Sequence, residues 1–398
     1  NDNLLILEPL AFLRVYMEFY QNRAVLSLGS NLGDREQTIV SCINAINNQV
    51  ATVVDVSRMY ESEAWGFSSD AFLNCAVLIH TTLSAEILLK SILELEKELG
   101  RKRSSEAGYQ ARSIDIDIIA FNEDIIQIDT LQIPHKEMQN RKFVLLPMCD
   151  LNFEWTHPAL HVSKEKLLAT TSDNSICVPF GKLENPIFKY DFGNCNYIAI
   201  EGNIGAGKTT LAKRIADDFN AKTVLERFAD NPFLPKFYED QARYAFPLEM
   251  SFLADRYQQI TDDLEQFDLF KDFIVADYHV FKSLIFSKIT LAEEEFRLYS
   301  NLFEIMYRQI PKPDLYIYLY QNTDRLLANI KKRGRDYEQH ITADYLEKIN
   351  QGYLEYIKNQ LNLNVLIIDA SDLDFVNKQN DYLLILNQIS EKLTASNF

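Results

Sequence analysis

The sequence is poor in residues that build disulfide bonds or zinc sites. Its 398 residues include only five cysteines, which is an odd number. They are spread along the chain, and no two of them form a Cys-x-x-Cys pair: Cys42, Cys75, Cys149, Cys177 and Cys195. This pattern indicates neither a disulfide framework nor a zinc site, and it fits buried thiols in a reducing cytoplasm best.

Long uncharged apolar runs are also lacking. The most apolar stretch near the start, residues 4–13, is interrupted and flanked by charged residues, and no cationic segment precedes it. We therefore expect neither a signal peptide nor a membrane span. Two interpretations of an N-terminal extension over residues 1–22 stay open: an amphipathic extra helix, or chain upstream of a start near Met17.

Basic residues are too few for a nucleic-acid-binding protein. The chain has 40 basic and 57 acidic side chains, which gives a formal net charge of −17. Binding to a phosphate backbone requires a basic face, so we do not expect a nucleic-acid partner. Nucleotides stay possible because a few local groups and Mg²⁺ hold them. The length suits two domains of roughly 150–200 residues each.

The first half of the chain alternates strand and helix patterns. Apolar periodicity predicts strands at residues 23–28, 53–60, 76–82 and 112–121, and helices at 34–47 and 85–99. The order β-α-β-β-α-β predicts an α+β ferredoxin-like sandwich for a domain over residues 23–178.

The second half has a different pattern. Residues 179–195 contain several Pro, Gly and Asn residues and are predicted to be a linker. Beyond them, apolar strands at 197–200, 273–276, 315–320 and 365–369 alternate with helical patterns at 208–219, 247–267 and 291–309. This alternation predicts an α/β fold with a parallel sheet over residues 196–398.

Two aspartates lie on the strand predicted at residues 112–121. Asp115 and Asp117 point to the same face because strand side chains alternate, and they repel each other unless a cation lies between them. Mg²⁺ suits this spacing. An exposed strand with a polar face is the alternative, but the nearby Arg101, Arg112 and Arg141 favour a site that transfers phosphoryl groups.

A phosphate-binding loop follows the strand at residues 197–200. The pattern GxxxxGK[ST] occurs between this strand and a helix, which is the context that the loop requires. Backbone N–H groups would cradle ATP phosphates, Lys208 would neutralise them, and Thr209 would bind Mg²⁺. We expect the ATP-binding residues to be Gly202, Asn203, Ile204, Gly205, Ala206, Gly207, Lys208, Thr209 and Thr210.

The first half resembles 6-hydroxymethyl-7,8-dihydropterin pyrophosphokinase of folate biosynthesis over roughly residues 23–178. The motifs that carry the resemblance are Leu28-Gly29-Ser30-Asn31-Leu32, Phe72-Leu73-Asn74, Gly100-Arg101-Lys102-Arg103, Arg112-Ser113-Ile114-Asp115-Ile116-Asp117, and Pro134-His135 through Asn140-Arg141-Lys142-Phe143. The resemblance implies that Asp115 and Asp117 hold two Mg²⁺ ions on ATP.

The same resemblance implies roles for the surrounding residues. Arg101 and Arg112 would act catalytically on the phosphates, and His135 and Arg141 would bind ATP. Three residues would bind the pterin by its edge and its ring: Phe72, Asn74 and Phe143. Tyr109 stands where the family usually has Trp in a mobile arginine loop, which leaves the metal site intact but puts loop closure in question.

The second half resembles deoxynucleoside kinases from about Tyr197 onward. Besides the phosphate-binding loop, the matching strings are Glu226-Arg227, Asp230-Asn231-Pro232-Phe233-Leu234, Phe246-Pro247-Leu248-Glu249-Met250 with Arg256, Ala276-Asp277-Tyr278-His279, and Arg333-Gly334-Arg335. The resemblance implies that Glu226 is the general base for the sugar 5′-hydroxyl and that Asp277 is the acidic partner of the metal.

Further roles follow from this second resemblance. Arg333 and Arg335 would close over ATP as a lid, for which the alternative is a solvated basic helix end. Tyr238 and Glu338 would hold the sugar 3′-hydroxyl, and Arg256 would contact the nucleoside. No NKxD string offers guanine-nucleotide specificity of the GTPase kind.

The base of the nucleoside is predicted from Glu249, where many of these kinases have Gln. A carboxylate only accepts hydrogen bonds. Guanine offers adjacent N1–H and N2–H donors, whereas adenine N1 is an acceptor. With an Ala-Asp-Tyr-His string typical of the bacterial deoxyguanosine kinase branch, we favour deoxyguanosine, and deoxyadenosine is the rival. Tyr278 replaces a usual arginine, so base contacts made by that arginine are not carried over.

We therefore predict a bifunctional enzyme with ATP as co-substrate, Mg²⁺ as cofactor, and small-molecule substrates. One alternative makes the second half a nucleotide-binding or oligomerising module, and another makes the first half a degenerate scaffold. A homodimer through the kinase domain, built on helices such as that at 291–309, and a cytoplasmic location are further expectations. The sequence leaves open whether the two sites communicate.

Overall fold

The computed structural model describes residues 21–64, 70–101, 112–193, 195–227, 231–265, 270–308 and 310–395. The chain folds into two compact units. The first comprises residues 21–191 and 374–387, and the second residues 192–373 and those from 388 onward. Predictions for the N-terminal extension, for Lys102, Arg103 and Tyr109, and for Asp230 concern residues outside the described ranges.

The first unit contains a six-stranded sheet with antiparallel pairing. Its strand order is β5-β1-β4-β3-β8, and β2 also pairs with β4. The strands are β1 (Asn22–Ser30), β2 (Thr52–Val56), β3 (Met59–Ser62), β4 (Phe72–Thr81), β5 (Asp115–Phe121) and β8 (Cys177–Gly181), beside a hairpin of β6 (Ile126–Ile128) and β7 (Leu131–Ile133).

The strand predicted at residues 53–60 is in fact two strands. The register between β2 and β4 shifts between Val53 and Asp55, and the chain leaves the ladder before β3 begins. Both segments nevertheless pair with the same strand β4.

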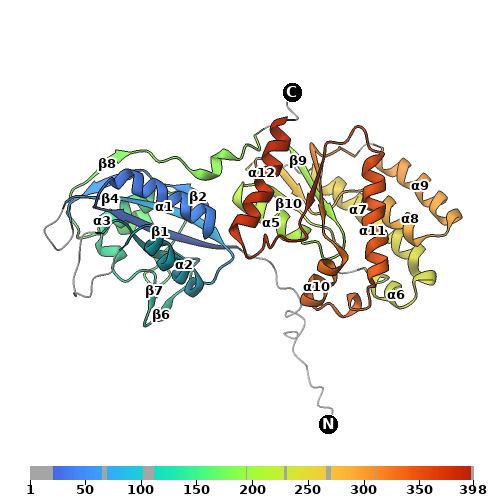
Figure 1. The fold of residues 1–398 in the computed structure, drawn as a ribbon, viewed down its shortest axis with the longest axis horizontal. Coiled ribbons are helices and arrows are strands. Elements are labelled where there is room, and N and C mark those ends of the chain that lie inside the picture. Colours follow the sequence, from blue (N-terminus) through green and yellow to red (C-terminus); the bar gives the residue numbers. More distant parts are fainter. Residues whose placement is uncertain are drawn as a thin grey trace, which may run out of the picture. The chain divides into compact units, whose positions relative to one another are not determined.

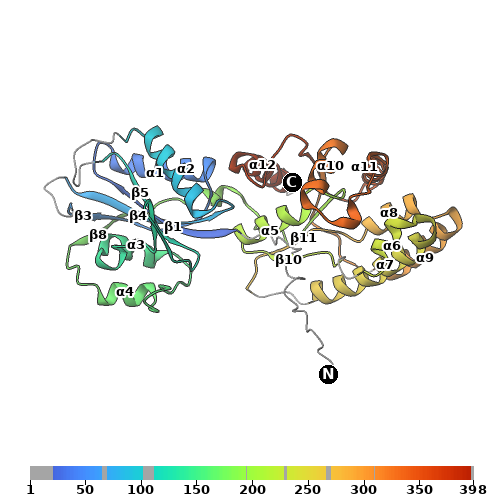
Figure 2. The ribbon, with the colours of Figure 1, turned by 90° about the horizontal axis from the view of Figure 1, so that it is seen from below.

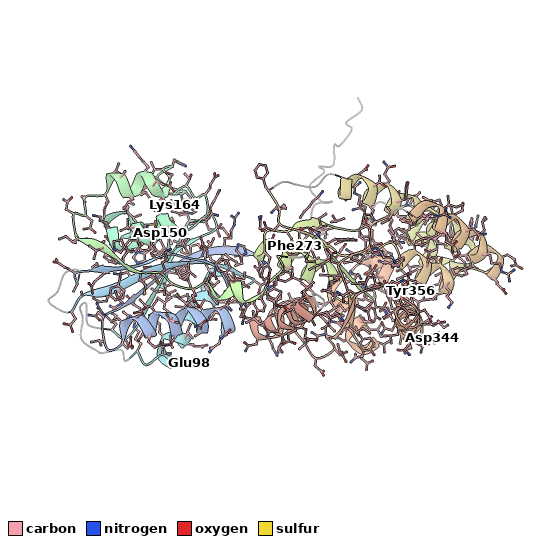
Figure 3. The ribbon with its side chains drawn as sticks, turned by 90° about the horizontal axis from the view of Figure 1, so that it is seen from above. Glu98, Asp150, Lys164, Phe273, Asp344 and Tyr356 are labelled. Carbon is pink, nitrogen blue, oxygen red and sulfur yellow. The ribbon has the colours of Figure 1, made fainter. Side chains whose placement is uncertain are left out.

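Helices cover both faces of this sheet. The four α-helices are α1 (Arg35–Gln49), α2 (Ala85–Glu98), α3 (Lys142–Asp150) and α4 (Lys164–Thr170). Figure 2 shows α1 and α2 on one side and α3 and α4 on the other. Figure 3 likewise places Glu98 of α2 and Lys164 of α4 on opposite sides. Along β1, Leu26 and Leu28 join one core while Val25 joins the other, as alternating side chains require.

The second unit is built on a five-stranded parallel sheet, which confirms that prediction. The order is β10-β11-β9-β12-β13. Figure 1 labels β9 and β10 of this sheet. The strands are β9 (Tyr197–Gly202), β10 (Lys222–Val224), β11 (Ile274–Ala276), β12 (Leu315–Tyr320) and β13 (Val365–Asp369). The last two agree with their predicted bounds to the residue. All six residues of β9 are buried, as expected for a central strand.

The helices of the second unit are α5 (Lys208–Asp218), α6 (Leu234–Glu239), α7 (Gln241–Glu265), α8 (Lys282–Thr290), α9 (Glu293–Tyr307), α10 (Thr323–Arg333) and α11 (Ala343–Lys358). Helix α12 (Gln379–Ala395) begins in residues that group with the first unit. Helix α7 starts six residues before Pro247, where the pattern had placed its start. Parallel pairing brings the segments after β9, β10 and β11 to one edge of the sheet, where ligands of such folds bind.

The segment predicted as a linker makes contacts of its own. Pro179 lies in β8, which pairs with β3. Asn185 donates a hydrogen bond from Nδ2 to the Val54 carbonyl at 2.8 Å. Within the second unit, the ring of Phe192 stacks on that of Phe273 at 5.2 Å between centroids. The domain boundaries stay a prediction.

Candidate active sites

The strand register of the first unit brings its predicted metal and pterin residues together. Gly29 on β1 lies opposite Asn74 on β4 and opposite Asp115 on β5. Cross-strand neighbours share a face, and two strand spacings amount to roughly 10 Å. A Cβ atom on Gly29 would lie 3.4 Å from Asn74 Oδ1 and 3.8 Å from a ring carbon of Phe72. A small residue therefore separates the predicted pterin contacts from Asp115.

Two arginines neutralise Asp115. Its Oδ1 lies 2.9 Å from Arg101 Nη1, and its Oδ2 accepts a hydrogen bond from Arg112 Nη1 at 2.7 Å. Burial, and then the nearby Asp115 carboxylate, raises the pKa of Asp117 to about 7. These two carboxylates are the kind of hard oxygen pair that a divalent cation stabilises.

Glu96 is a residue of this site that the sequence reasoning missed. It is 1% exposed, and its Oε1 accepts hydrogen bonds from the Ile116 backbone N–H at 2.9 Å and from Arg101. Glu96 thus fixes Arg101 against the strand that carries both aspartates. A glutamate four residues after Ile92 and beside Leu95, on the buried stripe of α2, was the available signal.

His135 and Arg141 come from the segment that follows β7. The His135 backbone N–H donates to the Ile119 carbonyl on β5 at 2.9 Å. Burial, with Arg141 as the next cause, lowers the pKa of His135 to about 4, so its imidazole is neutral. The Arg141 guanidinium lies 5.9 Å from the ring centroid of Phe143, and Phe143 belongs to α3, which packs against the strand of Phe72 and Asn74.

In the second unit, close packing explains two glycines of the phosphate-binding loop. A Cβ atom on Gly202 would lie 2.6 Å from the Leu319 carbonyl oxygen. Gly205 has a φ of 82°, and a Cβ there would lie 3.0 Å from Ile330. The loop therefore packs tightly against β12 and α10 and leads into the N-terminus of α5, where backbone N–H groups attract anions.

Lys208 and Asn203 hold the loop together. Lys208 Nζ donates to the Asn203 carbonyl at 2.9 Å. Burial first, and then the Lys282 ammonium, lowers the pKa of Lys208 to about 8. The Asn203 side chain donates to the Leu346 carbonyl and to Asn350 on α11, at 2.7 and 2.8 Å. The Asn203 side chain is therefore structural.

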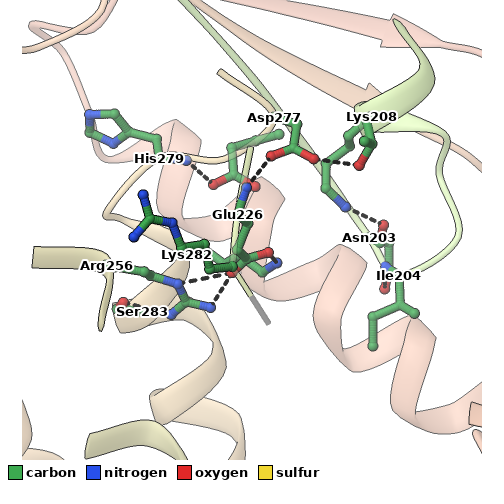
Figure 4. A network of polar contacts seen from close by, with 12 residues as sticks. Asn203, Ile204, Lys208, Glu226, Arg256, Asp277, His279, Lys282 and Ser283 are labelled. Carbon is green, nitrogen blue, oxygen red and sulfur yellow. Dashed lines mark hydrogen bonds and ion pairs between the residues drawn. The ribbon is translucent and has the colours of Figure 1, made fainter. Parts of the chain in front are cut away.

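The predicted base Glu226 is clamped by two cations (Figure 4). Arg256 donates to Glu226 Oε1 from Nε at 3.0 Å and from Nη2 at 2.6 Å, and Lys282 Nζ lies 2.6 Å from Oε2. Burial alone would raise the pKa of Glu226, but Lys282 first and Arg256 second lower it to about 2. Glu226 is therefore a carboxylate at neutral pH.

Asp277, which follows β11, meets Thr209 in the first turn of α5. Thr209 Oγ1 hydrogen-bonds to Asp277 Oδ2, and the Glu226 backbone N–H donates to Asp277 Oδ1 at 2.7 Å. No cluster of three or more His, Cys, Asp or Glu side chains suited to a metal occurs in the described ranges. One carboxylate and one hydroxyl suit Mg²⁺, which binds few protein ligands and completes its shell with water and phosphate oxygens.

One cavity unites most of the predicted kinase residues. Those that line it are Ile204, Gly205, Lys208, Thr209, Glu226, Tyr238, Glu249, Arg256, Asp277, Arg333, Arg335 and Glu338. Other loop residues predicted to bind ATP are not part of this lining: Gly202, Asn203, Ala206, Gly207 and Thr210. Segments after four strands and from α6 and α7 therefore share a single space.

The predicted lid and 3′-hydroxyl residues form one cluster. Glu338 accepts hydrogen bonds from Arg333 and, at 3.2 Å, from Arg335 Nη1. The ring of Tyr238 stacks on Tyr337, with 6.1 Å between centroids. Glu338 is thus paired with both lid arginines.

Glu249 is a buried carboxyl group in an aromatic part of the cavity. It is 2% exposed, and the same cavity is lined by Phe252 and Phe286. Its Oε1 lies 3.2 Å from Thr290 Oγ1, while Oε2 has no hydrogen-bond partner among the described residues. Burial, only partly offset by Arg256, raises the pKa of Glu249 to about 7.

Two further residues near the loop were missed. Lys282 lines the cavity and contacts Glu226, and the signal was a lone cation inside the apolar segment 280–286. Glu201 is fully buried at the end of β9, where it accepts hydrogen bonds from the His279 N–H at 2.7 Å and from Tyr353 Oη at 2.8 Å. Glu201 thereby fixes the segment that carries Asp277.

Both sites combine carboxylates suited to Mg²⁺ with cationic side chains suited to phosphate, as in enzymes that transfer phosphoryl groups from ATP. A model of the deoxynucleoside kinase family matches residues 198–394, and one of 7,8-dihydro-6-hydroxymethylpterin-pyrophosphokinase matches residues 25–153. Deoxyguanosine kinase of Bacillus subtilis is 37% identical over 199 residues, which cover 49% of this chain and 96% of that protein.

Two more relatives complete the comparison. A deoxyadenosine/deoxycytidine kinase of Bacillus subtilis is 32% identical over 197 residues, covering 48% of this chain and 91% of that protein. A 2-amino-4-hydroxy-6-hydroxymethyldihydropteridine pyrophosphokinase of Porphyromonas gingivalis is 39% identical over 136 residues, covering 33% of this chain and 92% of that protein. The chain therefore belongs to two families, with a pterin pyrophosphokinase domain followed by a deoxynucleoside kinase domain. In the described residues we find no helix with the length and apolarity needed to cross a membrane.

Proposed function

We propose that this chain catalyses two ATP-dependent reactions. The first unit transfers pyrophosphate from ATP to 6-hydroxymethyl-7,8-dihydropterin, and the second transfers the γ-phosphoryl group of ATP to the 5′-hydroxyl of a purine deoxynucleoside. The convergence of the phosphate-binding loop and the five other kinase strings on one cavity carries the second assignment. The first assignment is supported by the cross-strand alignment of Asp115, Gly29 and Asn74. The strand order supports a ferredoxin-like fold for the first unit.

The metal chemistry of both sites follows from their oxygen ligands. Asp115 and Asp117 would hold Mg²⁺ in the first site, and Thr209 with Asp277 would hold it in the second. Bound Mg²⁺ supplies positive charge that offsets the phosphate oxygens during transfer.

In the first site, the arginines bind phosphate and the aromatic residues bind the pterin. Arg101 and Arg112 already lie on Asp115, so both can move onto ATP oxygens once the aspartates are otherwise neutralised. His135 and Arg141 bind the nucleotide, with His135 neutral. Pterin contacts come from Asn74 and from the rings of Phe72 and Phe143. Because the acceptor is a primary alcohol, positioning and charge carry the reaction without a strong base.

In the second site, Glu226 orients and deprotonates the acceptor hydroxyl. Lys208 and the loop N–H groups bind the donor phosphates, and Arg333 and Arg335 close over them. Tyr238 and Glu338 hold the 3′-hydroxyl, so nucleoside binding competes with the lid arginines for Glu338. Asp277 is the acidic partner of Mg²⁺, and Arg256 contacts the nucleoside.

The preferred nucleoside is deoxyguanosine, because Glu249 lines the cavity beside Phe252 and Phe286, and its Oε2 has no hydrogen-bond partner among the described residues. The names of the two similar kinases support a purine substrate and keep deoxyadenosine as the rival. Glu249→Gln keeps the size of the side chain but adds a donor. We expect it to shift kcat/KM from deoxyguanosine towards deoxyadenosine; an unchanged ratio would remove Glu249 from base recognition.

The bifunctional assignment is tested with the whole chain. ATP consumption is measured with 6-hydroxymethyl-7,8-dihydropterin and with each of the four deoxynucleosides. Turnover of the pterin and of at least one purine deoxynucleoside supports the proposal. Absence of all nucleoside turnover would instead leave the second unit as a nucleotide-binding module.

We further propose that the chain dimerises through its second unit. Helix α9 exposes Leu298 and Ile305, which are 53% and 71% exposed, as an apolar surface on this unit. Sedimentation equilibrium of wild type and of a Leu298→Asp, Ile305→Asp double variant tests this: loss of the dimer is expected only in the variant. The free thiols fit a cytoplasmic location.

A further inference from the structure

Glu226 has one cation on each carboxyl oxygen, and these two cations are held differently. Arg256 uses Nε and Nη2 on Oε1, and its remaining Nη1 donates to Ser283 Oγ at 2.8 Å. Its guanidinium also lies 4.6 Å from the ring centroid of Phe252. Arg256 is therefore fixed on three sides, with a side chain that is 4% exposed.

Lys282 has a single hydrogen-bond partner among the described residues, Glu226. Its Nζ lies 2.6 Å from Glu226 Oε2, and the described residues offer it no second hydrogen-bond acceptor. An ammonium group has three donors, so two remain for a ligand. Lys282 lines the cavity together with Lys208 and Thr209 of the phosphate-binding loop. These two donors are therefore available to a ligand in the cavity where the phosphoryl group is transferred.

The local fold explains why the cation comes from Lys282. In the segment that joins β11 to α8, Tyr278 is fully buried in the hydrophobic core and His279 is 1% exposed. Only Asp277 and Lys282 of this segment line the cavity. Lys282 is the first residue of α8, and its stem lies over the Phe286 ring, with Nζ at 5.3 Å from the centroid.

We propose that during the reaction the Lys282 ammonium exchanges its ion pair with the Glu226 carboxylate for an ion pair with the new phosphate ester. This role rests on the nucleoside kinase function proposed above. The 5′-oxygen bonds to the γ-phosphorus as the bond between that phosphorus and the β,γ-bridging oxygen breaks, and ADP leaves with the electron pair. The hydroxyl proton moves to Glu226, which becomes neutral. Lys282 then loses the anion to which it is hydrogen-bonded, and the product phosphate is positioned to replace it.

Because Glu226 loses its charge while charge develops on the transferred phosphate, the Lys282 contact is stronger in the transition state than in the ground state, which is the condition for lowering a barrier. In the ground state the ammonium is already paired, so it adds little to nucleoside affinity. Arg256 cannot take the same role, because all of its described contacts hold it against Glu226, Ser283 and Phe252.

The test uses Lys282→Met and Lys282→Arg in the full chain, with Lys288→Met as a matched control on the same helix. Lys288 is 56% exposed and pairs with Glu355 outside this cavity. We expect Lys282→Met to lower kcat roughly 10²–10³-fold, as for loss of a donor to developing charge. Lys282→Arg should recover most of this loss, and the control should match wild type. Deoxyguanosine binding by each variant, measured by titration calorimetry, confirms that the second unit is folded.

Binding measurements distinguish this exchange of ion-pair partners from a role in which Lys282 only positions Glu226. The dissociation constants of deoxyguanosine and deoxyguanosine 5′-monophosphate are measured by titration calorimetry. We expect Lys282→Met to weaken the monophosphate at least about tenfold more than the nucleoside. A fall in kcat with an unchanged ratio of the two constants would show that Lys282 only positions Glu226, and would overturn the inference. A wild-type chain without any nucleoside kinase activity would overturn the proposed function, and this inference with it.

Discussion

The charge of Glu249 predicts that the choice between purines changes with pH. Charged or titratable groups face Glu249 from several elements: Arg256 on α7, Lys282 on α8, Tyr299 on α9, Tyr345 on α11 and Glu226 after β10. Burial is the largest cause of its raised pKa of about 7. The Thr290 hydroxyl lies 2.9 Å from the Phe286 carbonyl and 3.2 Å from Glu249. Its single proton can serve only one of them, so a protonated Glu249 that donates to Thr290 satisfies both.

The sign of the effect follows from hydrogen-bond chemistry. Below its pKa, Glu249 is a neutral acid that can donate to adenine N1 and accept from the adenine amino group. Above it, the carboxylate accepts from guanine N1–H and N2–H. The ratio of kcat/KM for deoxyguanosine to that for deoxyadenosine should therefore rise with pH.

The pKa sets the size of this change. With a value of about 7, the ionised fraction rises from about one tenth at about pH 6 to about nine tenths at about pH 8. If each form accepted only one purine, the ratio would rise by at most roughly 100-fold over this range. The assay is competition between the two nucleosides at a series of pH values. Glu249→Gln, which has no titrating group, should give a flat ratio.

A wild-type ratio that stays constant between these pH values would refute the reasoning about protonation. Base recognition would survive that result if Glu249→Gln still changed the ratio. A slope that persists in Glu249→Gln would assign the pH dependence to another group.

Three further variants follow from named contacts. Glu96→Gln should lower pterin turnover at least about tenfold, because it weakens the hold on Arg101; unchanged turnover would make Glu96 a packing residue. Gly202→Ala should destabilise the second unit by about 1–3 kcal/mol and abolish nucleoside turnover, since its Cβ would lie 2.6 Å from the Leu319 carbonyl oxygen; a thermal melt and a kinase assay check both. Glu249→Gln should be more stable than wild type at pH 8 by about 3 kcal/mol. The reason is that the pKa of Glu249 is higher in the folded than in the unfolded chain, so wild type loses stability as the pH rises from the unfolded-state pKa towards about 7. Equal urea midpoints would contradict this.

Sequence reasoning succeeded where a residue acts through its local segment. Short, continuous apolar runs such as those at β12 and β13 are typical of parallel strands, so their bounds were predictable, although β13 is only partly buried. The phosphate-binding loop is likewise a local pattern. Residues such as Glu226 and Arg335 were found because their strings carry a resemblance, and the cavity places them together.

The failures involve partners that are distant in sequence. Lys282 and Glu226 are 56 residues apart, and Glu96 meets Ile116 from a helix to a neighbouring strand. No periodicity links such pairs, because tertiary packing alone brings them together. The start of α7 was misplaced because proline usually marks the first turn of a helix, whereas Pro247 lies inside it.

The central claim is that one chain carries two independent active sites. Asp117→Ala and Lys208→Ala, each in the full-length chain, test it most directly when both activities are measured on the same preparation. We predict that Asp117→Ala loses pterin turnover and keeps nucleoside turnover, and that Lys208→Ala does the reverse. Loss of both activities in either variant, or of neither, would contradict this account.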